Sequence, residues 1–122
     1  MSFEFSLTTF SPTGKLLQIE YALKAVNKGK PAIGIRATNG VVIATDKKIP
    51  TDLIDDSSFQ KIQNITDQSG MVYAGMGPDF RVLVRKARKN AQAYYRVYHE
   101  HQPMNQVVSD TADLMQEFTL AG

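Results

Sequence analysis

The segment that most constrains the fold is a pair of short apolar runs on either side of a turn. Ala32-Ile33-Gly34-Ile35 and Val41-Val42-Ile43-Ala44 flank Asn39-Gly40, a dipeptide that tolerates positive φ in tight hairpin turns. The two runs are therefore predicted to form an antiparallel hairpin. Because their apolar residues occupy consecutive rather than alternate positions, both faces of this hairpin should be buried.

Three helices are predicted from apolar residues that recur at helical spacing. The first covers residues 15–28 and stops at Gly29, and the second covers residues 79–98. The third follows Pro103 and ends near Leu120. Its core-facing stripe is predicted to comprise Val108, Ala112, Met115 and Phe118.

The order of the predicted elements places the chain in the α+β class. Two further short strands are predicted at 61–65 and 71–74, so a helix, four strands and two helices follow one another. The length of 122 residues suits one domain. If the four strands form one sheet, the two long helices cover only one of its faces. The first helix, a partner chain or additional sequence would have to cover the other.

Composition and motifs exclude several classes of function. The chain has no cysteine, which excludes disulfides, thiol catalysis and the usual zinc-ribbon sites. No apolar run approaches the ~20 residues that span a bilayer, and residues 1–10 lack the pattern of a secretory signal. His99-Glu100-His101 favours a surface loop over a metal site, because ligands at i and i+2 do not share a helix face. No metal, no cofactor and no membrane contact are therefore expected.

The helix at 79–98 is strongly basic, and this leaves a nucleic-acid alternative open. Its basic residues are Arg81, Arg85, Lys86, Arg88, Lys89 and Arg96. Tyr94, Tyr95 and Tyr98 could stack on bases in a stand-alone binding module. Against this alternative stands an apolar stripe made of Phe80, Val84, Ala87, Ala91 and Tyr94. The stripe favours packing of the helix against a core, with its basic face at a subunit interface, so nucleic acid is the less favoured partner.

Three stretches resemble the α-type subunits of the proteasome. FSLTTFSPTGKLLQIEYALKAV at 5–26 is similar to the amino-terminal signature of that family. NGVVIATDKK at 39–48 is similar to its hairpin and the turn that follows. GMVYAGMGPDFRVLVRKAR at 70–88 is similar to its strand-to-helix passage, with wording nearest to the α2 type. The resemblance is continuous from about residue 3 to about residue 119.

The resemblance implies a fold and a division of the chain. Family members form an αββα sandwich like that of amino-terminal-nucleophile hydrolases, with two antiparallel sheets between helix layers. The amino-terminal half of that domain is expected here. Its parts would be a gate tail over 1–12, an outer helix over 15–28, strands within 32–77 and a helix pair over 79–120. Family members continue further, so the chain is expected to be carboxyl-terminally truncated, and to be only marginally folded alone because apolar faces stay exposed.

The resemblance also implies two sites. The family's gate positions fall on Phe3, Glu4, Pro12 and Tyr21. The lysine of its activator-docking pocket falls on Lys61, with nearby walls at Gly14, Leu16 and Gly29. The ammonium of Lys61 would pair with the terminal carboxylate of a regulatory ATPase or another activator. From the residues alone, a solvated lysine beside a strand is the alternative.

Catalysis is not expected from this chain. Catalytic relatives use an amino-terminal threonine, whose hydroxyl is the nucleophile and whose free amine is the base. That position falls on Lys30, and the supporting aspartate and lysine fall near Asp46 and Lys61. The resemblance therefore implies a non-catalytic α-ring subunit of the 20S proteasome, located in the cytoplasm and nucleus. Its expected partners are neighbouring α subunits, β-ring subunits and activator tails.

Overall fold

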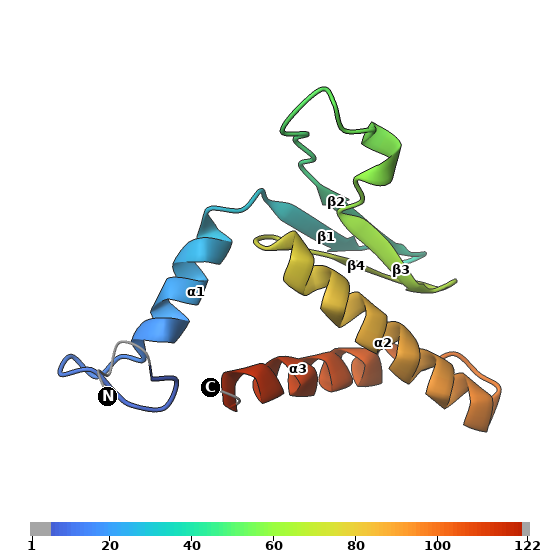
Figure 1. Ribbon diagram of the computed structural model, residues 1–122. Coiled ribbons are helices and arrows are strands. Elements are labelled where there is room, and N and C mark those ends of the chain that lie inside the picture. The colour runs from blue at the N-terminus through green and yellow to red at the C-terminus, as the bar shows by residue number, and fades with distance from the viewer. Residues whose placement is uncertain (1–5, 121–122) are drawn as a thin grey trace.

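Residues 6–120 are described by a computed structural model, and their elements follow the predicted order (Figure 1). The elements are α1 (Leu17–Asn27), β1 (Ala32–Arg36), β2 (Val41–Thr45), the 3-10 helix η2 (Asp56–Ser58), β3 (Ile62–Thr66), β4 (Ser69–Val72), α2 (Gly77–Tyr98) and α3 (Met104–Leu120). This order confirms the α+β class. Within residues 6–120, no helix is long and apolar enough to cross a membrane.

Strands β1 and β2 form the predicted antiparallel hairpin, but its turn differs from the prediction. The Ala37 N–H donates to the Gly40 carbonyl over 2.8 Å, which leaves Thr38 and Asn39 as the central residues of the turn. Gly40 therefore belongs to the flank of the turn, and positive φ is not needed there. The expectation of positive φ at Asn39-Gly40 is wrong, because the described residues with positive φ are Gly14, Gly75 and His99.

The four strands form two separate two-stranded sheets rather than one four-stranded sheet. Strands β3 and β4 pair antiparallel, with an irregularity between Asn64 and Thr66. The two hairpins approach each other where β2 meets β4. A Cβ atom added to Gly70 would lie 3.5 Å from Cδ1 of Ile43. Gly70 lies within β4 rather than ahead of it, and its lack of a side chain lets the hairpins pack closely.

The core lies between the β3–β4 hairpin and helix α2. Its buried cluster consists of Ile65, Ala87, Ala91 and Val107, with Met71 packed against it. The apolar stripe predicted for α2 is confirmed, because Phe80, Val84, Ala87 and Ala91 are buried and Tyr94 is half-buried. Figure 1 shows α2 lying along the β3–β4 hairpin and α3 returning beside α2.

The core stripe predicted for α3 is wrong for the described part of the chain. Val108, Met115 and Phe118 are exposed, as is Ala112, whereas Val107 is buried. Successive helical residues point about 100° apart at 3.6 residues per turn. When Val107 faces the core, Val108 therefore faces away from it. Val108 instead lines an open apolar groove of about 280 Å³.

The β1–β2 hairpin is not covered within residues 6–120. Every residue of β1 is exposed, and Ile35 exposes 62% of its surface. The prediction of burial on both faces is thus wrong for this part of the chain. Helices α2 and α3 lie on the side of the β3–β4 hairpin, and α1 extends away from the sheets (Figure 1).

The carboxyl-terminal end of α2 carries strain that a substitution can relieve. His99 adopts φ 53°, and its N–H donates to the Tyr95 carbonyl over 2.8 Å. A left-handed backbone costs an L-residue about 1–2 kcal/mol, and glycine avoids this cost. Glycine also loses more chain entropy on folding, which cancels about half of that gain. We expect His99→Gly to raise the free energy of unfolding by about 0.5–1 kcal/mol in urea denaturation. His99→Ala keeps the strain and is the matched control, so an equal gain in both variants would contradict this explanation.

Candidate functional site

Lys61 directly precedes strand β3, and its side chain is buried. The residue exposes only 6% of its surface, and its Nζ donates to the backbone carbonyl of Asp46 over 2.9 Å. The ion pairs within residues 6–120 are Lys15–Glu20, Lys30–Asp46 and Lys47–Asp56, so Lys61 has no carboxylate partner there. The alternative of a solvated lysine is therefore wrong. A buried cation with only neutral partners is unfavourable unless a counter-charge arrives.

The ring of Tyr73 forms the second contact of this ammonium. Lys61 Nζ lies 5.2 Å from the Tyr73 ring centroid, within the range of a cation–π interaction. Tyr73 in turn packs on Phe80 of α2, with a centroid separation of 4.7 Å. Sequence reasoning missed Tyr73, although the contact follows from the β3–β4 register, which pairs Ile62 with Val72 and so places Lys61 opposite Tyr73.

Asp46 connects the ends of the first hairpin to Lys61. Its carboxylate lies 3.8 Å from Lys30 Nζ, and its own N–H donates to the Pro31 carbonyl over 3.3 Å. The hydroxyl of Thr45 donates to the same carbonyl over 3.0 Å. Because the register places the end of β2 opposite the start of β1, Lys30, Asp46 and Lys61 come together in one cluster.

The loop ahead of β3 is folded by its own contacts. Lys47 Nζ lies 2.6 Å from both the carboxylate and the backbone carbonyl of Asp56. The Asp55 carboxylate accepts bonds from the hydroxyl and the N–H of Ser57, at 2.8 and 3.0 Å. The Ser57 hydroxyl and then its N–H lower the pKa of Asp55, with a smaller contribution from the charge of Lys47. These contacts hold the segment that leads from Asp46 to β3.

The predicted walls of the docking pocket do not all meet Lys61 within one chain. Leu16 and Gly29 lie beyond opposite ends of the 11-residue helix α1, which is roughly 16 Å long. Gly14 lies in the turn before Leu16, with φ +76°. A small pocket lined by all four residues would have to be completed between two subunits, as the resemblance implies.

The gate positions are only partly described. Phe3 and Glu4 lie outside residues 6–120, so nothing is established about them. Pro12 is exposed in a turn whose Gly14 N–H donates to the Ser11 carbonyl over 2.8 Å. Tyr21 is exposed on α1. Both described gate residues are therefore accessible, and the gate cluster stays a prediction.

The basic face of α2 is partly used for contacts within the chain. Arg88 donates from Nε to the Asn64 carbonyl over 2.7 Å and from Nη2 to the Gln63 side chain over 3.3 Å. Lys86 Nζ lies 5.0 Å from the Phe118 ring centroid. The tyrosines predicted for base stacking contact other rings, since Tyr94 packs on Tyr98 at a centroid separation of 4.4 Å. This arrangement does not support the nucleic-acid alternative.

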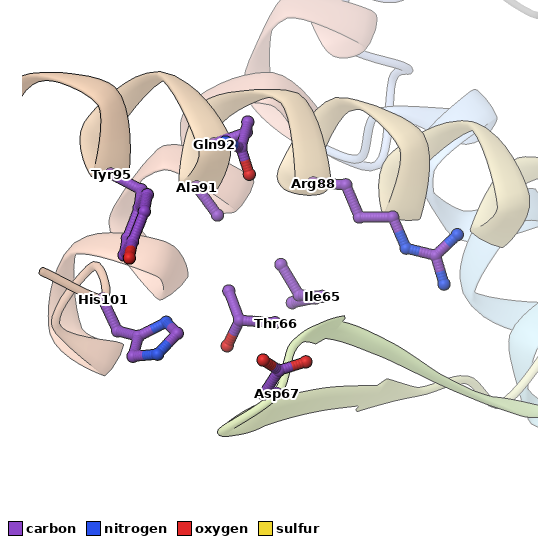
Figure 2. A pocket seen from close by; sticks show the side chains of 8 residues that line it. All are labelled: Ile65, Thr66, Asp67, Arg88, Ala91, Gln92, Tyr95 and His101. Atoms are coloured by element: carbon purple, nitrogen blue, oxygen red, sulfur yellow. The ribbon is translucent and has the colours of Figure 1, made fainter. Parts of the chain in front are cut away.

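A cavity of about 420 Å³ lies between α2 and the β3–β4 turn. Figure 2 shows the guanidinium of Arg88 at one end, and Tyr95 and His101 at the other. The lining residues are Ile65, Thr66, Asp67, Arg88, Ala91, Gln92, Tyr95 and His101. Three or more metal-binding side chains do not gather here or elsewhere in the part of the chain that the structure describes.

Two family models together match almost the whole chain. Residues 3–25 match the N-terminal signature of A-type proteasome subunits, and residues 26–122 match the general model of proteasome subunits. The chain belongs to the proteasome subunit family. This membership confirms the resemblance on which the site residues were assigned.

The α-type relatives make the assignment more specific. The chain is 62% identical over 120 residues to the proteasome alpha type-2 subunit of Oryza sativa subsp. indica. It is 61% identical to the proteasome alpha type-2-A subunit of Arabidopsis thaliana and 57% identical to the proteasome alpha type-2 subunit of Dictyostelium discoideum. Each match covers 98% of this chain and 51% of the relative. The resemblance to α2-type subunits is thus confirmed, and the chain spans about half the length of these relatives.

Proposed function

We propose that this proteasome-family chain is a non-catalytic α-ring subunit of the 20S proteasome. It would contribute to ring assembly, pore gating and activator docking in ubiquitin-dependent protein degradation, in the cytoplasm and nucleus. Its similarity to alpha type-2 subunits supports the place in the α ring. Its partners would be neighbouring α subunits, β-ring subunits and the tails of regulatory ATPases or other activators.

The buried charge of Lys61 is the observation that carries the docking function. Within residues 6–120 this ammonium contacts a carbonyl and an aromatic ring but no carboxylate. An ammonium has three donors, so an incoming carboxylate finds both the missing counter-charge and unused protons. A chain-terminal carboxylate suits such a site because its oxygens can accept hydrogen bonds from the ammonium while supplying the counter-charge.

The non-catalytic role rests on Lys30. Its backbone nitrogen lies within the chain after α1, so it is an amide and cannot serve as the free amine base of an amino-terminal nucleophile. Its side chain carries no hydroxyl, and its ammonium lies 3.8 Å from the Asp46 carboxylate. Lys30 therefore supplies neither the hydroxyl nor the free main-chain amine of an amino-terminal nucleophile.

The proposed αββα sandwich and ring contacts agree with the uncovered faces. The two hairpins form separate sheets, which agrees with a sandwich of two sheets better than with a single sheet. Ile33 and Ile35 of β1 are exposed and apolar, as are Val108, Met115 and Phe118 of α3. Exposed apolar surface of this kind marks packing or subunit interfaces. The gate would be formed by the tail over 1–12 and by Tyr21 at the outer surface.

The ring assignment is tested by recovering the tagged chain from its own cell lysate and measuring the mass of what accompanies it. We expect a large particle that contains other α and β subunits. Ile35→Asp should abolish this recovery because it places a charge on an apolar face that assembly would bury. Thr38→Asp, in the turn of the same hairpin, is the matched control. Recovery of the unmodified chain only as a monomer or an aggregate would contradict the proposal.

A further inference from the structure

We infer that Lys30 keeps Lys61 available to a carboxylate ligand by holding the carboxylate of Asp46 away from it. The inference rests on the proposed docking function of Lys61. It assigns to Lys30 a positioning role, through Asp46, at the place where catalytic relatives have their nucleophile.

Asp46 contacts both lysines, Lys30 through its carboxylate and Lys61 through its backbone carbonyl. The backbone carbonyl of Asp46 already lies 2.9 Å from Lys61 Nζ. An aspartate side chain is short, so rotation between its staggered χ1 positions can turn its carboxylate toward the ammonium that its own carbonyl contacts. In the structure the carboxylate instead faces Lys30, with a separation of 3.8 Å.

The Asp46 carboxylate can pair with Lys30 or with Lys61, and the free energies of these two arrangements are close. The presence of the Lys30 side chain can therefore decide between them. The Lys30–Asp46 pair is half exposed, with side-chain exposures of 50% and 54%, and pairs of this kind contribute only about 0.2–1 kcal/mol. Lys61 is buried, so its attraction for a carboxylate is screened less. Entering that site, however, costs the Asp46 carboxylate its hydration. Pairing with Lys30 lets the Asp46 carboxylate stay hydrated. This small difference in free energy is enough to keep the carboxylate at Lys30 rather than at Lys61.

Removal of Lys30 should therefore let Asp46 occupy the ligand's position. The Asp46 backbone is anchored to Pro31 by its own N–H and by Thr45, so only the side chain has to move. An intrachain pair between Asp46 and Lys61 would supply the counter-charge that the site otherwise takes from a ligand. Ligand binding would then have to displace that pair.

A ligand-free measurement tests this competition in the full chain. The methylene and ammonium NMR signals of Lys61 are recorded in the unmodified chain, Lys30→Gln, Asp46→Asn and the double variant, with amide spectra as a check of the fold. We expect the Lys61 signals to move in Lys30→Gln and to return in the double variant. Unmoved signals in Lys30→Gln, or equal displacement in the double variant, would refute the role of Lys30.

A titration of the assembled particle that contains the chain then separates this inference from the docking proposal, since the predicted pocket walls would meet Lys61 only between two subunits. The probe is an N-acetylated peptide with a free terminal carboxylate, and the same peptide with a terminal amide is the control. Lys61→Gln should remove the preference for the carboxylate form. Lys30→Gln should weaken binding of that form about three- to five-fold, as expected for a half-exposed ion pair, and Asp46→Asn should not weaken it. The double variant should bind as Asp46→Asn does.

The outcomes distinguish which statement fails. If Lys61→Gln binds the carboxylate peptide as the unmodified chain does, docking at Lys61 is wrong. If Lys61→Gln loses the preference while Lys30→Gln keeps full affinity, docking stands and the positioning role is wrong. A double variant as weak as Lys30→Gln would mean that Lys30 contacts the ligand directly, which also contradicts positioning through Asp46.

Discussion

Replacing Phe80 by alanine should lower the free energy of unfolding by about 3–5 kcal/mol, the usual cost of deleting a buried phenylalanine ring. Phe80 exposes only 4% of its surface near the start of α2. Its ring packs on Tyr73 with a centroid separation of 4.7 Å. The loss is comparable with the total stability of many domains, about 5–15 kcal/mol. Since few side chains are buried in residues 6–120, the variant should lose cooperative unfolding.

The experiment is urea denaturation followed by far-ultraviolet circular dichroism. Phe10→Ala is the matched control, because Phe10 exposes 66% of its surface and surface substitutions usually change stability by less than about 0.5 kcal/mol. Similar losses in the two variants would show that Phe80 is not a core residue. Because Phe80 supports Tyr73, and Tyr73 contacts Lys61, any Phe80→Ala chain that stays folded should also show altered Lys61 NMR signals.

Helical spacing predicted which face of α2 is buried but not which face of α3. In α2 the apolar stripe is flanked by basic residues, so only one rotation of the helix buries Phe80 and Val84. In α3 Val107 and Val108 are both apolar and adjacent. Their order along the chain does not indicate which one meets Ile65, and the contact with the β3–β4 hairpin selects Val107.

Lys61 was predicted as a candidate docking residue from the family resemblance, but the acceptor of its hydrogen bond was not predictable from the sequence. The acceptor nearest to Lys61 is a backbone carbonyl, which has no signature in the residue types. Lys61 is buried between the Asp46 carbonyl, which follows β2, and the ring of Tyr73, which follows β4. The pairing of Lys30 with Asp46 follows from the register of β1 and β2, which the turn residues alone did not fix.

Gly29→Ala should lower the free energy of unfolding by about 2–3 kcal/mol, at the upper end of the usual cost of overpacking. The sequence predicts Gly29 as a helix stop, and the structure adds a steric reason for glycine. A Cβ atom at this position would collide with the amide nitrogen of Gly75, and would lie 2.9 Å from its Cα and 3.0 Å from the Val26 carbonyl oxygen. All three are backbone atoms, so no side-chain rotation can make room. Helix α1 would have to move away from the Gly75 loop.

Gly40→Ala separates this clash from the general effect of replacing a glycine. A Cβ atom at Gly40 would meet nothing within 4 Å, and Gly40 is not among the described residues with positive φ. Replacing such a glycine reduces the entropy of the unfolded chain and usually stabilises a protein by about 0.4–1 kcal/mol. The two substitutions should thus change the urea midpoint in opposite directions. A neutral or stabilising Gly29→Ala would mean that α1 does not pack on Gly75 at this close distance.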